Sequence, residues 1–196
     1  GSGEVARFNQ PTGVAVDTSG NVFVADAWNH RVRKIDPLGN VTTFAGSGSR
    51  DSVDGYQTSA AFDVPYDVAL DSSGNLYVAD RFNYQIRKIT PDGTVSTLAG
   101  SGSSGSADGA ADVATFDAPN GIAVDALGNV YVADTDNNLL FDSHCFEIIF
   151  RNTILCNVFL NTFLCSQLNR FTNWKVKHVV HIFLLYLGRC RNAFPN

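Results

Sequence analysis

The sequence predicts an all-β protein that forms part of a β-propeller, a wheel of four-stranded antiparallel sheets called blades. Three observations lead to this prediction. One segment recurs three times at intervals of 54 residues, starting at Phe8, Phe62 and Phe116. Every copy contains short runs of residues that favour strands, and turn-forming residues separate these runs at the same places. A repeat of this length is typical of propellers and solenoids.

Each copy predicts four strands in the same order. In the first connection, SGN, Gly20 is free to adopt positive φ. The third connection, DPLGN, combines Pro37, which fixes φ, with Gly39. In the first copy the four predicted strands are GVAVD at 13–17, NVFVAD at 21–26, RVRKI at 31–35 and NVTTFAG at 40–46.

A sheet of this size cannot bury both of its faces alone, and radial stacking of several sheets solves this problem. We therefore interpret each copy as one blade. The Gly- and Ser-rich stretch 46–61, which recurs after the second copy, is expected to connect successive blades. The pairs Arg33-Lys34 and Arg87-Lys88 are expected to be solvated strand charges.

The repeats predict one domain over residues 1–140, with about 2.5 blades. The third copy follows the pattern only to Asn138, and the copies span about residues 8–48, 62–102 and 116–140. Because the sheets at the two ends lack neighbours, we expect unpaired edges and an uncovered face that promote association. The chain contains no Met and starts inside a position equivalent to the Asp54-Gly55 turn, so we expect a truncated N-terminus.

Residues 141–196 differ sharply from the repeats in composition. All four cysteines lie there, whereas 16 of the 17 glycines lie before it. Residues 1–140 carry 8 Lys and Arg against 17 Asp and Glu, a net charge of −9, and the tail carries 6 against 2, a net charge of +4. We interpret the tail as aberrant or non-homologous, such as translated non-coding sequence; a genuine divergent extension is the alternative. The apolar run 179–188 is about half as long as a membrane span needs, and the longer stretch 145–165 contains Glu147 and Arg151. The Cys and His spacing of the tail disfavours a zinc site.

The segments PTGVAVD, GNVFVAD and NHRVRKI resemble the NHL repeat, and GNLYVADRFNYQIRKI in the second copy is similar to its core. The resemblance covers about residues 1–140. It implies a β-propeller, most often of six blades, that serves as a non-catalytic scaffold for binding a protein or a small ligand. The sequence assigns no catalytic residue, no cofactor and no cellular compartment.

Positions that differ between the copies are the candidates for binding. Thr12, Tyr66 and Asn120 each follow the repeated Pro, and the resemblance places this loop near the mouth of the central channel. Trp28 and Phe82 differ at a second turn, where an exposed aromatic residue could anchor a partner or pack against the adjacent blade.

Positions that repeat are expected to be structural. An Asp ends the second strand of each copy and an Asn follows three residues later, a pattern in which the side chain accepts backbone N–H groups of its own turn. These structural turn residues are Asp26, Asn29, Asp80, Asn83, Asp134 and Asn137.

An enzymatic alternative is a metal-dependent hydrolase or lactonase. The PNG at 119–121 followed by Asp134 resembles the gluconolactonase type of propeller, in which such an Asn and Asp help to hold Ca or Zn. The metal ligands here would be Asn120 and Asp134, but the Glu ligand of that family has no counterpart. His30 could suggest the histidine site of a peptide-amidating lyase, but we expect a surface turn residue.

The net charge of −9 makes nucleic acid an unfavourable partner, and a membrane is not expected either.

Overall fold

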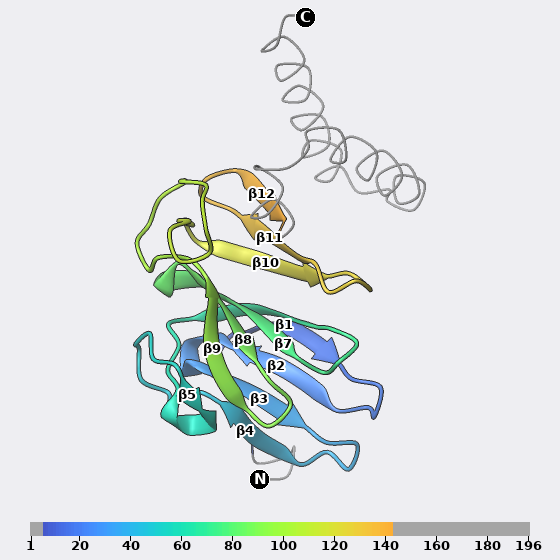
Figure 1. Cartoon of the computed structure of the whole chain (residues 1–196). Coiled ribbons are helices and arrows are strands. Elements are labelled where there is room, and N and C mark those ends of the chain that lie inside the picture. Colours follow the sequence, from blue (N-terminus) through green and yellow to red (C-terminus); the bar gives the residue numbers. More distant parts are fainter. Residues whose placement is uncertain (1–5, 143–196) are drawn as a thin grey trace, which may run out of the picture. The chain divides into compact units, whose positions relative to one another are not determined.

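The computed structural model describes residues 6–142, which form three antiparallel sheets (Figure 1). This architecture confirms the predicted fold class, a partial β-propeller. The tail 143–196 and the first five residues lie outside the described part, so the predictions for them are not addressed by the structure. No helix within 6–142 is long and apolar enough to cross a bilayer.

Blade 1 is a four-stranded sheet in which neighbours in sequence are neighbours in space, in the order β1-β2-β3-β4. Its short connections follow the predicted turn chemistry: Gly20 has φ 81° and Gly39 has φ 83°. The turn between the second and third strands is a single 3-10 turn, η1 (Ala27–Asn29). The strands are β1 (Pro11–Val16), β2 (Val22–Asp26), β3 (Arg31–Ile35) and β4 (Val41–Ala45).

Blade 2 has the same four strands and a fifth that the sequence did not reveal. The connection from blade 1 contributes β5 (Gly55–Tyr56), which pairs antiparallel with the outermost strand, and a 3-10 turn, η2 (Gln57–Ser59). The connection is therefore part of the next blade. The other elements are β6 (Pro65–Leu70), β7 (Leu76–Asp80), η3 (Arg81–Asn83), β8 (Gln85–Ile89) and β9 (Thr94–Ala99), and the sheet order is β5-β9-β8-β7-β6.

Blade 3 is described as three strands, β10 (Pro119–Val124), β11 (Val130–Asp134) and β12 (Leu139–Asp142). The recognisable repeat ends at Asn138, yet β12 pairs with β11 from Asp134↔Leu139 to Tyr131↔Asp142. The backbone ladder depends on N–H and C=O groups rather than on particular side chains, so it continues where the Arg-Lys-Ile signature has been lost.

The apolar core lies between the blades, not within any one of them. Phe23, Ala25 and Val32 of blade 1 pack against Val68, Leu76 and Val78 of blade 2. A second cluster joins the opposite face of blade 2 to blade 3, through Tyr77, Ala79, Ile86, Ile122, Val130 and Val132. Both faces of blade 2 are therefore covered, which is why all five residues of β7 are buried.

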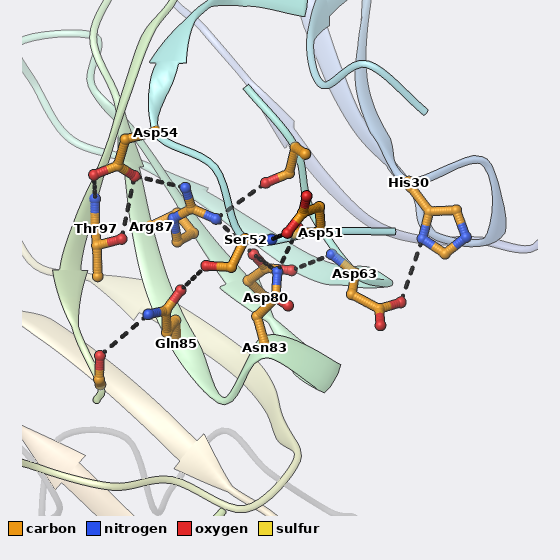
Figure 2. Close-up of polar contacts among 12 residues, drawn as sticks. His30, Asp51, Ser52, Asp54, Asp63, Asp80, Asn83, Gln85, Arg87 and Thr97 are labelled. Atoms are coloured by element: carbon orange, nitrogen blue, oxygen red, sulfur yellow. Dashed lines mark hydrogen bonds and ion pairs between the residues drawn. The ribbon is translucent and has the colours of Figure 1, made fainter. Parts of the chain in front are cut away.

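A buried polar network in blade 2 corrects the prediction of solvated strand charges (Figure 2). The Arg87 side chain is fully buried. Its guanidinium donates to Asp80 at 2.9 Å and to Asp54 at 2.6 Å. Asp54 also accepts the backbone N–H of Thr97, and the network thus joins the inter-blade connection to β7, β8 and β9. Burial was not foreseeable from an Arg-Lys pair because it depends on the connection folding over the strand.

Candidate functional site

The innermost strands β1, β6 and β10 lie side by side, and each begins at a Pro. The residue before each Pro is not glycine but has left-handed backbone geometry: Gln10 has φ 46°, Val64 φ 56° and Ala118 φ 51°. This geometry is costly for a β-branched residue, and strained backbone of this kind is concentrated at functional sites. The start of each innermost strand is therefore a position that the surrounding structure must hold in place.

The repeated Asp and Asn residues hold these loops. In blade 1 the Asp26 carboxylate accepts the backbone N–H of Asn9 at 2.8 Å and the amide of Asn29 at 2.9 Å. The Asp26 carboxylate therefore accepts a backbone N–H from the segment before the innermost strand. The sequence analysis had expected it to accept backbone N–H groups of its own turn. The same arrangement recurs in the other two blades. The Asp80 carboxylate accepts the backbone N–H of Asp63 and the amide of Asn83. The Asp134 carboxylate accepts the backbone N–H of Asp117 and the amide of Asn137.

The three residues that follow the Pro lie on neighbouring innermost strands. Thr12 Oγ1 donates a hydrogen bond to the backbone carbonyl of Tyr66, which joins β1 to β6. Asn120 holds the equivalent position in β10, and its Oδ1 is buried without a hydrogen-bond partner. We call the surface formed by Thr12, Tyr66, Asn120 and the adjacent Arg81 and Phe82 the loop face.

Arg81 is the residue of the loop face that sequence reasoning missed. Its guanidinium lies over the ring of Tyr66 at 5.2 Å and over the ring of Phe82 at 5.1 Å. Within residues 6–142 its side chain has no hydrogen bond or ion pair, and its Nε is buried. The signal was present in the sequence: the equivalent residues are Ala27 and Thr135, so only blade 2 carries a charge there.

Asp67 is a second residue that the sequence analysis did not single out. Its carboxylate accepts the backbone N–H of Ile122 at 3.1 Å and so joins β6 to β10. The equivalent residue in the first copy is Gly13, where an added Cβ would lie 2.5 Å from the Asp67 Cα. Glycine at 13 is therefore required for the close approach of β1 to β6.

The two aromatic candidates differ in environment. Trp28 is 45% exposed, which leaves its indole available to a partner. Phe82 is half-buried against the Arg81 guanidinium. Whether Trp28 anchors a partner stays a prediction.

His30 is buried rather than a surface turn residue, which corrects the prediction. It is 7% exposed, and its Nδ1 accepts the backbone N–H of Val64 at 3.1 Å. Figure 2 shows the imidazole of blade 1 next to the Asp63 carboxylate of blade 2, 3.5 Å away. His30 thus supports the strained residue before Pro65, across the boundary between two blades.

The predicted metal ligands Asn120 and Asp134 have different roles in this geometry. Asp134 is fully buried, and its carboxylate already accepts hydrogen bonds from Asp117 and Asn137. Burial raises the pKa of Asp134, and these hydrogen bonds oppose the shift. In the part of the chain from 6 to 142, no three His, Cys, Asp or Glu residues gather into a group that could hold a metal ion. A calcium or zinc site stays a prediction.

Comparisons with known proteins agree with the repeat architecture. Residues 8–35 and 116–141 match the NHL repeat. NHL repeat-containing protein 2 of Homo sapiens is 32% identical over 148 residues, covering 68% of this chain and 20% of that protein. The chain therefore spans about a fifth of the length of this relative.

Solved structures show the same blades. A protein of unknown function from Bacteroides thetaiotaomicron VPI-5482 is 33% identical with a TM-score of 0.58, over 63% of this chain and 32% of that one. An auxiliary nutrient binding protein from the same organism is 26% identical with a TM-score of 0.61, over 66% and 36% of the two chains. Residues 8–35 and 116–141, in blades 1 and 3, match the NHL repeat, and over the part that the blades cover the chain belongs to the NHL-repeat β-propellers.

Proposed function

We propose that the blades form a non-catalytic binding scaffold and that a protein or small ligand docks on the loop face. The repeated parts of each blade hold a common backbone, while the starts of the innermost strands carry different side chains, the exposed Thr12 and the half-buried Tyr66 and Asn120. A rigid framework with variable loop residues suits recognition. The description of one solved relative as an auxiliary nutrient binding protein supports a binding role.

The observation that carries this proposal is the stacked but unpaired guanidinium of Arg81. A guanidinium that lies over two aromatic rings is held in orientation, and it retains N–H donors that match the geometry of a carboxylate. The ligand is therefore a molecule that presents a carboxylate to Arg81. A larger protein partner could also contact the exposed Trp28.

The test uses benzoate as the probe and benzamide as an uncharged probe of the same shape. We expect benzoate to give a saturable shift of the Arg81 Nε–H signal in ¹H–¹⁵N NMR spectra, and benzamide to give none. Arg81→Thr, which introduces the residue of blade 3, should weaken benzoate binding at least about tenfold, or about 1.4 kcal/mol. Arg50→Thr is the matched control, because Arg50 is exposed and already paired with Asp63. Equal binding of both probes, or no effect of Arg81→Thr, would contradict the proposal.

The metal-dependent hydrolase is the second candidate, and one observation favours it. The buried Oδ1 of Asn120 has no hydrogen-bond partner, as expected for a ligand atom of a hard cation. Calcium or zinc uptake that is lost in Asn120→Ala, together with lactone hydrolysis, would support the hydrolase over the scaffold. The scaffold is favoured by the hydrogen bonds that the Asp134 carboxylate already accepts from Asp117 and Asn137, because these bonds occupy the oxygens that would bind a metal ion.

A further inference from the structure

The backbone of Val64 links His30 of blade 1 to Arg81 of blade 2. Its N–H donates to the Nδ1 of His30 at 3.1 Å, and its carbonyl accepts the backbone N–H of Arg81 at 3.3 Å. Val64 is buried and has left-handed geometry, with φ 56°. A change at the imidazole therefore reaches Arg81 through a single residue.

The hydrogen bond from His30 supports the most strained of the three equivalent residues. Gln10 and Ala118 share the left-handed geometry of Val64, but neither of them is β-branched. Val64 therefore bears the highest conformational cost of the three. For Ala118 the equivalent of His30 is Tyr84, whose ring has no nitrogen to accept an N–H group. The acceptor that reaches across from the preceding blade is thus found where the backbone needs it most.

The hydrogen bond to Val64 requires a neutral imidazole, because the Nδ1 must offer a lone pair. The Asp63 carboxylate lies 3.5 Å from the same Nδ1, so a protonated His30 would donate to Asp63 and leave the Val64 N–H without its acceptor. The charged groups that face the imidazole are Asp63, from the segment before β6, and Arg50, from the connection between the blades. Behind them, the Asp80 carboxylate accepts the backbone N–H of Asp63.

We propose that neutral His30 is a positioning residue that holds Arg81 ready for a carboxylate by fixing Val64. When the Val64 N–H loses its acceptor, its left-handed geometry loses support, and the carbonyl that holds the Arg81 backbone turns away. The guanidinium then leaves its place over the rings of Tyr66 and Phe82. The inference rests on the proposed function for the carboxylate, but the effect of His30 on the position of Arg81 is measurable without a ligand.

The first measurement follows the full chain without a ligand in ¹H–¹⁵N NMR spectra as the pH is lowered from 8 to 5. We expect the Arg81 Nε–H signal, which the two neighbouring rings shift, to move with the same midpoint as the imidazole signals of His30. His30→Asn should place the Arg81 signal, already at pH 8, where the protonated wild-type chain has it. Arg50→Thr should move both midpoints to higher pH together, because the Arg50 guanidinium opposes protonation. An Arg81 signal that does not follow the His30 titration would overturn the proposal.

The second measurement uses benzoate, which keeps its charge over most of this range. At pH 8 the affinity for benzoate should fall at least about fivefold in His30→Asn, the low end of the usual coupling between two sites. It should be unchanged in Arg50→Thr, which retains the imidazole. In the wild-type chain the affinity should fall by the same factor as His30 becomes protonated. Asp80 is present in every variant, so any pH dependence that remains in His30→Asn belongs to other groups.

The outcomes separate this inference from the proposed function. Benzoate that binds through Arg81 with equal affinity in the wild-type chain and in His30→Asn would overturn the role of His30 and leave the binding site intact. No binding of benzoate to the wild-type chain at pH 8 would overturn the proposed function and this inference with it.

Discussion

At the residue scale, His30 shows how one side chain couples two blades. Its Nδ1 accepts the Val64 N–H, so the imidazole must be neutral and carry its proton on Nε2. Burial lowers the pKa of His30; the Asp63 carboxylate opposes the shift, and the Arg50 guanidinium adds to it. The lowered pKa means that protonation works against the folded state. The stability that His30 contributes is therefore present above about pH 6.5 and is lost as the pH falls through its folded pKa.

We predict that His30→Asn removes this pH dependence. Asn138 occupies the equivalent position in blade 3 with φ 57°, so the left-handed geometry is retained. At pH 8 the variant should be less stable by about 1 kcal/mol, the contribution of one hydrogen bond. The gap between the two unfolding free energies, measured by urea titration, should narrow as the pH is lowered from 7 to 5. A gap that stays constant over this range would show that His30 is not the responsible group.

At the element scale, β8 is held by two ion pairs of the buried Arg87 side chain, one with the buried Asp80 and one with the half-exposed Asp54. Burial raises the pKa of Asp80 to about 7, while the Arg87 guanidinium and the hydrogen bond from Asn83 oppose the shift. Because this pKa lies above the ordinary value of 3.8, the stability linked to the protonated form is complete below about pH 4 and is lost as the pH rises through 7. Above about pH 7 the negative charge of the buried Asp80 is compensated by the Arg87 guanidinium.

Arg87→Leu should therefore destabilise the chain by about 3–5 kcal/mol at pH 8, because a buried carboxylate loses its partner. The loss should be smaller at pH 5, where Asp80 holds its own proton. Adding Asp80→Asn should recover part of the loss at pH 8, since no uncompensated charge then remains. Lys88→Leu serves as the control: Lys88 is only half-buried and lies over the Tyr77 ring, so denaturant titration should detect a change below about 1 kcal/mol. Equal losses at both pH values would contradict the assignment to Asp80.

At the scale of the whole molecule, stability depends on how many neighbours each blade has. Phe62 and Phe116 occupy equivalent positions and are both fully buried between blades. Phe8 is their counterpart in blade 1, where it is half-buried and lines a hollow together with Pro11 and Val14. One residue type at three equivalent sites thus reports directly on blade stacking.

We predict a graded response to replacement of these residues by alanine. Phe62→Ala and Phe116→Ala should each cost about 3–5 kcal/mol, as is usual for a buried Phe. Phe8→Ala should cost about 1 kcal/mol or less, because Phe8 is only half-buried. Chemical unfolding of the three variants at the same low concentration provides the comparison. If Phe8→Ala costs as much as the other two replacements, burial between blades is not what stabilises these sites.

Local features were predictable because their causes lie within a few residues. Asp17 accepts the backbone N–H groups of Ser19 and Asn21, and Gly20 between them takes positive φ, so the turn is encoded in five consecutive residues. Thr12 and Tyr66 were grouped because they occupy equivalent positions of the repeat, and the hydrogen bond between them shows that they are neighbours. The burial of Arg87 and His30 did not follow, because each depends on a partner from a distant segment.

The blades follow from the sequence alone, because a 54-residue period, strands of alternating apolar residues and turns of fixed chemistry together indicate stacked antiparallel sheets. Which polar side chains are buried between those sheets, and which remain unpaired, depends on contacts that form only in the folded chain. Arg81 and Arg87 are both arginines of blade 2, yet Asp54 and Asp80 neutralise Arg87, whereas Arg81 stacks on Tyr66 without a carboxylate. The physical reason is that pairing depends on what lies within a few ångströms in space, and the blades bring together residues that are dozens of positions apart in sequence.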